Sequence, residues 1–360
     1  MGRVRGLRDT LLAGAIVSLL FSCASPPAAP TDTELVPGQA EERFDEADDE
    51  SEVNSELPEG FDKMPVSTFT EVWVYVTGGN EGELKADYPI SDVAYFSAGI
   101  DSYGKLVNVP KRSRLSRYQG RVHLVLEGGG AALTHFVLKP GSSERTQLVA
   151  DLTAAAKDFD GLQIDFEAIP ARDADNYRSF LAELRARLPG KIFSVALHAR
   201  TRTLENDAED YGKILPLADK IFVMAYDEHW SASAPGPIAS MDWCRAVVEY
   251  SLKTVGPDKL IMGLPLYGRI WGSERTNRAM FHSGMERLRR ENNAGEARRE
   301  NDIPTFTYQI PVTVTGYYED AQSLSTRLDM YRRMRVQSVG FWRLGQETPV
   351  LWKLVKLAPD

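Results

Sequence analysis

A barrel of eight parallel strands alternating with helices, (β/α)8, is the α/β fold that this sequence predicts, and two observations lead to it. Apolar, β-rich segments of four to six residues recur eight times between residues 66 and 360. The segments between them place apolar residues at helical spacing, as over 177–188, where Pro189 and Gly190 end the helix. Strands this uniformly apolar are typical of a parallel sheet that is covered on both faces.

The eight predicted strands are short runs dominated by Val, Ile, Leu and Phe. They span 72–76, 93–96, 122–126, 161–166, 192–197, 221–225, 260–264 and 339–342. Eight strands within the 295 residues from 66 to 360 fit a barrel of about 250 residues with insertions. A doubly wound sheet is the alternative, but the sequence shows no Gly-rich dinucleotide fingerprint that would favour it.

The connection after the seventh predicted strand, 272–315, is too long for a plain loop. It is predicted to be either a short insertion into the barrel or an active-site loop. Within it, 305–308 and 312–315 are expected to pair as a small hairpin. We therefore assign residues 64–360 to the barrel, with the insertion at about 272–315.

The first 22 residues have the pattern of a signal peptide. Three arginines precede an apolar run over 11–21 that is too short to span a bilayer. Cys23 follows Ser22 in a context that resembles the lipobox of bacterial lipoproteins, which implies cleavage before Cys23 and its acylation. We expect a lipid anchor on the extracytoplasmic face of a bacterial membrane, either the cell membrane or the outer membrane. The alternative is an ordinary signal peptide with an incidental cysteine.

Residues 23–63 are predicted to be a disordered acidic tether, because they are poor in large apolar residues and dense in carboxylates. Residues 1–23 carry a net charge of +2 and residues 31–63 carry −11, while the whole chain carries −9. The barrel over 64–360 is therefore neutral. A neutral domain has no bulk attraction for nucleic acid, so we expect no nucleic-acid partner, and we expect a monomer.

The fourth predicted strand and the residues beside it, Asp160 to Glu167, carry the chemistry. Because side chains alternate along a strand, Gln163, Asp165 and Glu167 share one face, which is expected to look into the barrel. Carboxylates two residues apart lie roughly 7 Å apart at Cα, so ionising one disfavours ionising the other. Glu167, nearest the mouth, is the candidate general acid. The alternative is a structural network of buried carboxylates satisfied by Arg or Lys.

The octet Asp160–Glu167 resembles the DGxDxDxE signature of glycoside hydrolase family 18, which comprises the chitinases and related N-acetylglucosaminidases. The resemblance covers nearly all of residues 66–360, including 95–97 and 318–321, and within the family it is greatest to the spore cortex-lytic group. The resemblance implies a TIM barrel with this motif on strand four. It also implies that Glu167 protonates the leaving oxygen while Asp165 orients the substrate's acetamido group, whose carbonyl attacks the anomeric carbon. No enzyme nucleophile is needed, and an oxazolinium intermediate and net retention follow.

Three later segments resemble further elements of the family. One is 263–269, which is similar to the GxPxYG turn and would place Tyr267 facing the cleft. Tyr226 lies in Met224-Ala225-Tyr226-Asp227, which resembles MxYD, and would hydrogen-bond the acetamide carbonyl as a catalytic residue. Trp342 ends strand eight and would form the floor under the reacting sugar. Taken singly, such aromatic residues more often belong to a core. By the resemblance, the substrate-binding residues are Asp160, Gln163, Tyr95, Met224, Asp227, Tyr267, Arg269 and Trp342.

Two positions depart from the family pattern. Gln163 stands where chitinases have Asp and the cortex-lytic group has Asn. We hypothesise that its amide hydrogen-bonds Asp165 and keeps that carboxylate ionised over more of the pH range. Glu127 replaces the serine of the family's SxGG element and is expected to be a solvated loop acid.

Three functions compete. The first is a retaining hydrolase of β-1,4 bonds next to N-acetylglucosamine, in peptidoglycan or a chitin-like glycan. The second is a chitinase-like glycan-binding lipoprotein that is weakly active or inactive, against which Asp165 and Glu167 argue. The third is a tethered scaffold that only displays loops. The five histidines lack metal-ligand spacing, so we expect no metal and no cofactor, and His198 is expected to be structural or substrate-lining.

Overall fold

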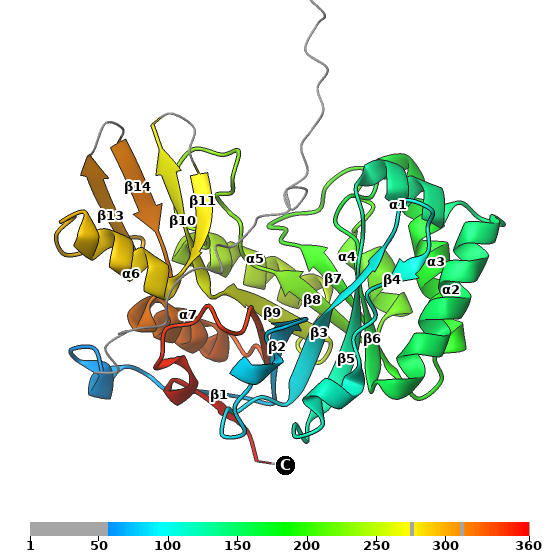
Figure 1. Ribbon diagram of the computed structural model, residues 1–360, viewed down its shortest axis with the longest axis horizontal. Helices are drawn as coiled ribbons and strands as arrows, with labels where there is room; N and C mark the ends of the chain where they lie inside the picture. Colours follow the sequence, from blue (N-terminus) through cyan, green and yellow to red (C-terminus); the bar gives the residue numbers. More distant parts are fainter. Residues whose placement is uncertain (1–56, 274–276, 310–312, 360) are drawn as a thin grey trace, which may run out of the picture. The chain divides into compact units, whose positions relative to one another are not determined.

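The computed structural model describes residues 57–273, 277–309 and 313–359, and within them eight parallel strands close into a barrel (Figure 1). Its order is β2–β3–β5–β6–β7–β8–β9–β15, and β15 pairs with β2 to complete the circle. The strands are β2 (Glu71–Thr77), β3 (Asp92–Ile100), β5 (Arg121–Glu127), β6 (Gly161–Asp165), β7 (Ile192–His198), β8 (Lys220–Met224), β9 (Leu260–Pro265) and β15 (Ser338–Trp342). The predicted fold class and all eight predicted strands are confirmed.

The predicted signal peptide, the acylation of Cys23 and the tether as far as residue 56 lie outside the described residues. Within the described part of the chain, no helix combines the length and the apolar character needed to cross a membrane.

Helices follow most strands and cover the outside of the barrel. They are α1 (Ala131–Leu138), α2 (Ser143–Ala155), α3 (Ala174–Arg187), α4 (Tyr211–Ile214), α5 (Met241–Thr254) and α7 (Ala321–Arg333). The helix predicted over 177–188 is α3, and its apolar stripe of Tyr177, Phe180, Leu181 and Leu184 is buried. Gly190 adopts φ of 73°, a left-handed conformation that ends this unit without strain.

Each barrel strand is apolar on both faces because each face is covered. On β8, Ile221 and Val223 pack outward under the helices, while Phe222 and Met224 pack inward. The interior is tight: a Cβ at Gly340 would lie 2.3 Å from Cε2 of Phe222. Only glycine fits at this position, and the side chains fill the middle of the barrel as they do in barrels of this size.

The N-terminal end of the barrel is closed by a buried polar network. Asp92 accepts hydrogen bonds from Nε of Arg121 at 2.6 Å and from Nε2 of His123 at 2.8 Å. Burial raises the pKa of Asp92, but these hydrogen bonds outweigh burial and hold that pKa at about 2. His123 stacks on Trp73 with ring centroids 4.2 Å apart. The open end is therefore the C-terminal one.

A second, antiparallel sheet lies between β9 and α7 in the sequence. Its strands are β10 (Tyr267–Gly272), β11 (Asn277–Phe281), β12 (Arg298–Glu300), β13 (Ile303–Gln309) and β14 (Thr313–Tyr317), in the order β11–β10–β14–β13–β12. Helix α6 (His282–Glu291) packs on it through Met285 (Figure 1). The predicted hairpin is observed, with Thr307 opposite Thr315, although Val312 lies outside the described residues.

Three short strands complete the described structure. β1 (Ser67–Phe69) pairs in parallel with β16 (Val355–Leu357), so the start of the described chain is joined to its end. β4 (Leu106–Val107) pairs with the end of β3 as a hairpin at the C-terminal end of the barrel.

Candidate active site

Strand β6 carries three polar side chains into the barrel. Leu162, Ile164 and Phe166 pack in the core under the helices. Because side chains alternate along a strand, Gln163, Asp165 and Glu167 face the interior. Gln163 is fully buried and Asp165 is 5% exposed. Glu167, just beyond the end of β6, is half-buried at the open end of the barrel.

The Gln163 amide is held by β2 across the barrel and by the neighbouring strand β7, and not by Asp165. The hydroxyl of Tyr75 on β2 donates to Oε1 of Gln163 at 2.5 Å, and Nε2 of Gln163 donates to Oγ of Ser194 on β7 at 3.2 Å. The hypothesis that Gln163 hydrogen-bonds Asp165 and keeps it ionised is wrong, because the amide is engaged across the barrel.

Asp165 is a buried acid with an unmet hydrogen-bonding capacity. Its Oδ1 is buried and has no hydrogen-bond partner among the described residues. Burial, followed by the nearby charges of Glu167 and Glu127, raises the pKa of Asp165 well above its usual range. This shift favours the protonated form of Asp165, which is opposite to the direction that we hypothesised from the sequence.

Glu167 has the protonation behaviour of a general acid. Burial raises its pKa most, His198 lowers it, and Glu209 and Asp227 raise it, which together place the pKa at about 7. A carboxyl with a pKa near the working pH can both deliver and recover a proton. Asp165 and Glu167 together carry at least one proton at neutral pH, so the site can protonate a leaving group.

His198 ends β7 beside these acids and is bound to Glu209. Nδ1 of His198 lies 2.8 Å from Oε1 of Glu209, and the backbone N–H of His198 donates to Oε2 at 2.9 Å. Burial lowers the pKa of His198, but the Glu209 carboxylate outweighs it and raises the pKa to about 10. The sequence singled out His198 as a strand end. It carried no signal for Glu209, which lies 11 residues further along.

Aromatic side chains line the interior next to the acids. Trp342, at the end of β15, meets Tyr75 and Phe96 edge to face, with ring centroids 5.0 Å and 4.9 Å apart. Met224 lies in the same inner cluster, which Trp342 and Tyr226 flank as partly buried side chains. Trp342 therefore ends its strand on the inside of the barrel, packed against the rings of Tyr75 and Phe96.

The ends of β8 and β9 are tied together by polar contacts. The hydroxyl of Tyr267 donates to Oδ1 of Asp227 at 2.5 Å, and Nη2 of Arg269 lies 3.7 Å from the same oxygen. The rings of Tyr226 and Tyr267 meet edge to face at 6.5 Å. Burial, then the nearby Tyr75 and Asp165, raises the pKa of Tyr226 well above its usual range, so its hydroxyl stays protonated and can donate.

Two residues that were expected to bind substrate lie elsewhere. Tyr95 belongs to the core outside the barrel, where its hydroxyl donates to Glu81, and its neighbour Phe96 faces the interior instead. Asp160 precedes β6 at the closed end, where its Oδ2 accepts the backbone N–H of Val122 at 2.8 Å. At about 3.3 Å per residue, Asp160 lies on the order of 20 Å from the open end.

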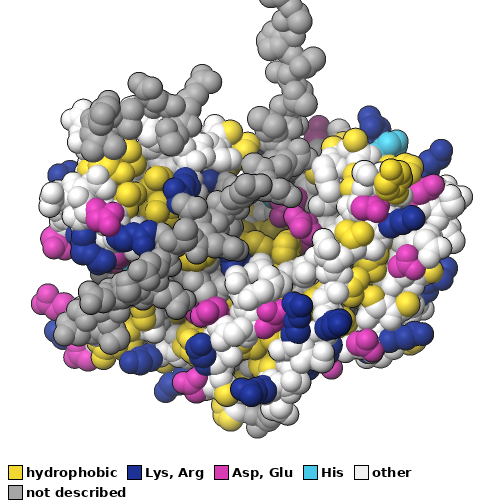
Figure 2. Space-filling view, viewed as in Figure 1, with side chains coloured by type: hydrophobic (Ala, Val, Ile, Leu, Met, Phe, Trp, Pro, Cys, Tyr) yellow, Lys and Arg dark blue, Asp and Glu magenta, His cyan; other side chains and the backbone are white. Residues whose placement is uncertain are grey.

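The structure therefore brings most of the predicted site residues together and adds others. The residues brought together contact one another, are coupled electrostatically or are joined through Tyr75. They are Gln163, Asp165, Glu167, Met224, Tyr226, Asp227, Tyr267, Arg269 and Trp342. Tyr75 was not among the residues predicted from the sequence, although its place two residues after Trp73 on β2 could have indicated an inward ring. Figure 2 shows a hollow in the surface with hydrophobic and acidic side chains side by side.

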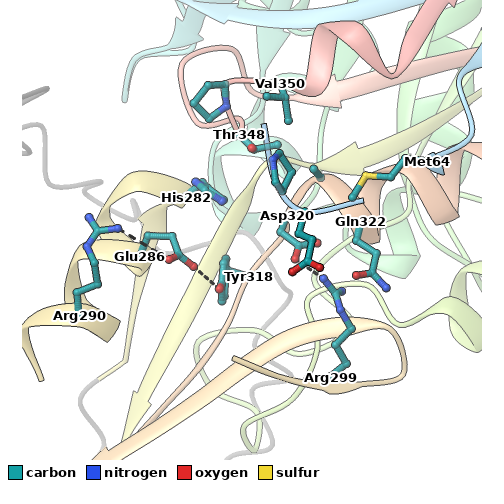
Figure 3. A pocket seen from close by; sticks show the side chains of 14 residues that line it. Met64, His282, Glu286, Arg290, Arg299, Tyr318, Asp320, Gln322, Thr348 and Val350 are labelled. Carbon is teal, nitrogen blue, oxygen red and sulfur yellow. Dashed lines mark hydrogen bonds and ion pairs between the residues drawn. The ribbon is translucent and has the colours of Figure 1, made fainter. Parts of the chain in front are cut away.

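A separate pocket of about 300 Å³ lies between α6, the start of α7 and residues 348–350 (Figure 3). None of the predicted site residues lines it. Its cationic and anionic groups are paired with one another, since Arg299 binds Asp320 and Arg290 lies 4.0 Å from Glu286, to which Tyr318 also donates. The pocket therefore leaves no concentrated charge of one sign.

Across the described ranges, no group of three or more His, Cys, Asp or Glu side chains is arranged to hold a metal ion. The chemistry open to the site is that of the paired acids, a cationic imidazole, protonated tyrosines and an aromatic floor.

Sequence comparison places this geometry among known proteins. Residues 71–347 match the sequence model of Glycosyl hydrolases family 18. The protein named "Putative sporulation-specific glycosylase YdhD" from Bacillus subtilis is 31% identical over 248 residues, covering 65% of this chain and 59% of that protein. The cortical fragment-lytic enzyme of Bacillus anthracis is 22% identical over 292 residues, covering 73% of this chain and 66% of that enzyme. The chain thus spans between 59% and 66% of the length of these relatives.

Solved structures share the fold. The Bacillus cereus spore cortex-lytic enzyme SleL superposes with a TM-score of 0.72 at 22% identity, over 80% of this chain and 74% of that one. A chitinase from Chromobacterium violaceum superposes with a TM-score of 0.71 at 24% identity, over 79% of this chain and 97% of that one.

Proposed function

The chain belongs to glycosyl hydrolase family 18, and on that premise we propose that it is a retaining glycosidase that cleaves β-1,4 bonds next to N-acetylglucosamine. The observation that carries the proposal is the pair of inward acids, Asp165 and Glu167, whose pKa values are both raised by burial. Such a pair supplies a proton to a leaving oxygen at neutral pH.

The first step uses the substrate's own acetamide. Glu167 donates its proton to the glycosidic oxygen, the bond from that oxygen to the anomeric carbon breaks, and the acetamide carbonyl oxygen bonds to the same carbon. The electron pair of the broken bond leaves with the alcohol, and a cyclic oxazolinium ion remains. The tethered carbonyl replaces an enzyme nucleophile, so only one carboxyl needs to act as an acid.

Asp165 acts on the nitrogen of the acetamide. Its buried Oδ1, which has no partner among the described residues, can accept the acetamide N–H. That hydrogen bond and the growing positive charge both favour the ionised form of Asp165, leaving the proton of the pair on Glu167. The protonated hydroxyl of Tyr226 donates to the acetamide carbonyl and turns it toward the anomeric carbon.

The second step returns the enzyme to its starting state. Water attacks the anomeric carbon from the side that the leaving group vacated, and the Glu167 carboxylate takes its proton. The oxazolinium ring opens to the acetamide, and two inversions give net retention. Trp342 lies under the sugar as an apolar floor, while Asp227, held by Tyr267 and Arg269, binds its hydroxyl groups.

The glycan is proposed to be peptidoglycan or a chitin-like oligomer. Support comes from the names of similar proteins, which include cortical fragment-lytic enzymes and chitinases. We further propose that Cys23 is acylated and holds the enzyme on the outer face of a bacterial membrane, where the wall is the nearest substrate. No nucleic acid, metal or cofactor is part of this proposal.

The test is hydrolysis by the full chain and by Glu167→Gln, with Glu249→Gln on the exposed face of α5 as the matched control. Release of nitrophenol from nitrophenyl chitobioside and of reducing ends from purified peptidoglycan are measured. Release of reducing ends from peptidoglycan by the parent and the control that falls by a factor of at least about 100 in Glu167→Gln supports the proposal, with a smaller loss expected on the nitrophenyl substrate. Sugar binding without hydrolysis in all three proteins would favour a glycan-binding role instead.

A further inference from the structure

His198 and Glu167 occupy matching positions on neighbouring strands. Strands β6 and β7 pair in parallel, and the last pair in their register is Ile164 with Val195. Glu167 and His198 each follow that pair by three residues. Both therefore reach the open end of the barrel on the inner face, side by side.

His198 is held by one contact at its ring and two at its backbone, among other interactions. Nδ1 lies 2.8 Å from Oε1 of Glu209, the backbone N–H donates to Oε2 of the same carboxylate at 2.9 Å, and the backbone carbonyl accepts the hydroxyl of Tyr211 at 2.6 Å. The side chain is 16% exposed. Because Glu209 holds Nδ1, the second ring nitrogen points away from Glu209.

Glu209 is itself held in position by Arg200, which also binds Asp207. Nη2 of Arg200 lies 3.6 Å from its Oε2, and Arg200 also donates from Nε to Asp207 at 2.8 Å. The Glu209 carboxylate thus lies between Arg200 and His198, and its contact with Nδ1 favours the cationic form of the His198 ring. Burial lowers the pKa of His198, but the Glu209 charge and hydrogen bond raise it to about 10.

The charges around Glu167 come from five strands and the loop after β7. They are Glu127 from β5, Asp165 from β6, His198 from β7, Arg200, Asp207 and Glu209 from the loop that follows it, and Asp227 beyond β8, with Arg269 of β10 paired to Asp227. Among the groups that act on Glu167 directly, His198 is the cation and the others are carboxylates.

We propose that His198 is a positioning residue that keeps a fixed positive charge beside Glu167 and so sets the strength of the catalytic acid. The inference rests on the glycosidase function proposed above and goes beyond it, since it names a residue that acts through the acid. A neighbouring cation stabilises the Glu167 carboxylate, so proton transfer to the leaving oxygen becomes easier. Without the cation, burial and the surrounding carboxylates would hold the proton on Glu167 more tightly.

The pH profile of His198→Gln tests this directly. Glu167 acts in its protonated form, so activity falls as pH rises through its pKa. Removal of the cation raises that pKa, and we expect the alkaline limb of kcat/KM to move up by about 1 pH unit. His198→Lys keeps the positive charge and is expected to bring the limb back toward that of the parent.

A second readout compares leaving groups. Nitrophenol leaves with little help from an acid, whereas a sugar alcohol must be protonated. A weaker acid in His198→Gln should therefore lower kcat on a chitin oligomer about threefold to tenfold more than kcat on a nitrophenyl glycoside. A purely structural defect would lower both rates alike.

The matched control is His135→Gln. His135 on α1 also binds a carboxylate, with Nδ1 2.8 Å from Oδ2 of Asp173, but this pair lies outside the barrel. Its profile should superimpose on that of the parent. If His198→Gln does not fold, the His198 proton resonances of the parent give the second measurement. They should show a cationic ring through pH 8, and a ring that is neutral at that pH would overturn the inference.

Three kinetic outcomes would also overturn the inference. They are an alkaline limb that does not move in folded His198→Gln, a rise in KM with the limb unchanged, or equal rate losses on both leaving groups. An inactive parent would overturn the proposed function together with this inference, whereas an active parent with a superimposable His198→Gln profile would overturn the inference alone.

Discussion

The hydroxyl of Tyr75 on β2 donates a hydrogen bond of 2.5 Å to the amide oxygen of Gln163 on β6, across the interior of the barrel. Both side chains are almost completely buried. Tyr75 also supports Trp342, with ring centroids 5.0 Å apart. One tyrosine thus links the strand that carries the acids to the aromatic floor.

Tyr75→Phe removes this bond and keeps the ring. Because the Gln163 oxygen is left buried without its donor, we expect a loss of about 1–3 kcal/mol in the free energy of unfolding, with a fall in kcat as Gln163 and the adjacent Asp165 lose their fixed position. Urea unfolding and nitrophenyl chitobioside hydrolysis measure the two effects. Tyr103→Phe, at a side chain that is 74% exposed, is the control. Unchanged stability would show that the bond contributes nothing.

The pH dependence of kcat/KM should report the raised pKa of Glu167. Its pKa is about 7, so the acid is protonated below this value and loses its proton above it. We therefore expect activity to fall tenfold per pH unit well above pH 7, measured at substrate concentrations far below KM. An alkaline limb centred near 4 to 5, the range of an ordinary glutamate, would contradict the assignment of Glu167 as a buried acid.

Loss of the Glu167 charge should stabilise the empty protein at alkaline pH. A carboxyl whose pKa is raised on folding stabilises the protein while it is protonated, and this contribution is lost as pH rises through about 7. Glu167→Gln cannot ionise, so we expect it to unfold at a higher temperature than the parent at pH 8 and at nearly the same temperature at pH 5. Calorimetry at the two pH values checks this, and equal shifts at both would rule out the electrostatic cause.

Trp342→Ala should remove the apolar floor of the site. We expect binding of a chitin oligomer to weaken by about tenfold or more, which corresponds to about 1.4 kcal/mol, because a buried aromatic face is lost. Trp342→Phe should lose less, since it keeps a ring against Tyr75 and Phe96. Titration calorimetry in the Glu167→Gln background measures binding without hydrolysis. Affinity that survives in Trp342→Ala would place the sugar elsewhere.

Asp160→Asn separates the two ends of β6. Asp160 accepts the N–H of Val122 at the closed end, and Asn keeps an acceptor oxygen but loses the negative charge that strengthens the bond. We therefore expect a modestly lower unfolding temperature, with KM and kcat unchanged below it. Thermal unfolding followed by circular dichroism, with kinetics at 25 °C, measures both. A raised KM in a fully folded Asp160→Asn would restore the substrate-binding role that the sequence motif suggested.

The sequence was sufficient for the strands and for the inward face of β6. Strand spacing is a local property, and Gln163, Asp165 and Glu167 interrupt an apolar strand at every second position, so their face could be predicted. β3 offered no such interruption, because Val93, Ala94, Tyr95 and Phe96 are all apolar or aromatic. The sequence of a strand that is buried on both faces does not reveal which side chains face the interior. This is why Tyr95 was expected to face the barrel interior, where the structure has Phe96.

What the sequence determined by itself was the barrel, the fourth strand as the bearer of the acids and the aromatic residue that ends the eighth strand. Only the tertiary structure decided the partners of those residues: Tyr75 lies 88 residues from Gln163, and Glu209 came to bind His198 through the path of a loop. The physical reason is that periodicity arises within one strand, whereas charge, protonation and support in a buried site arise from side chains that other strands bring alongside.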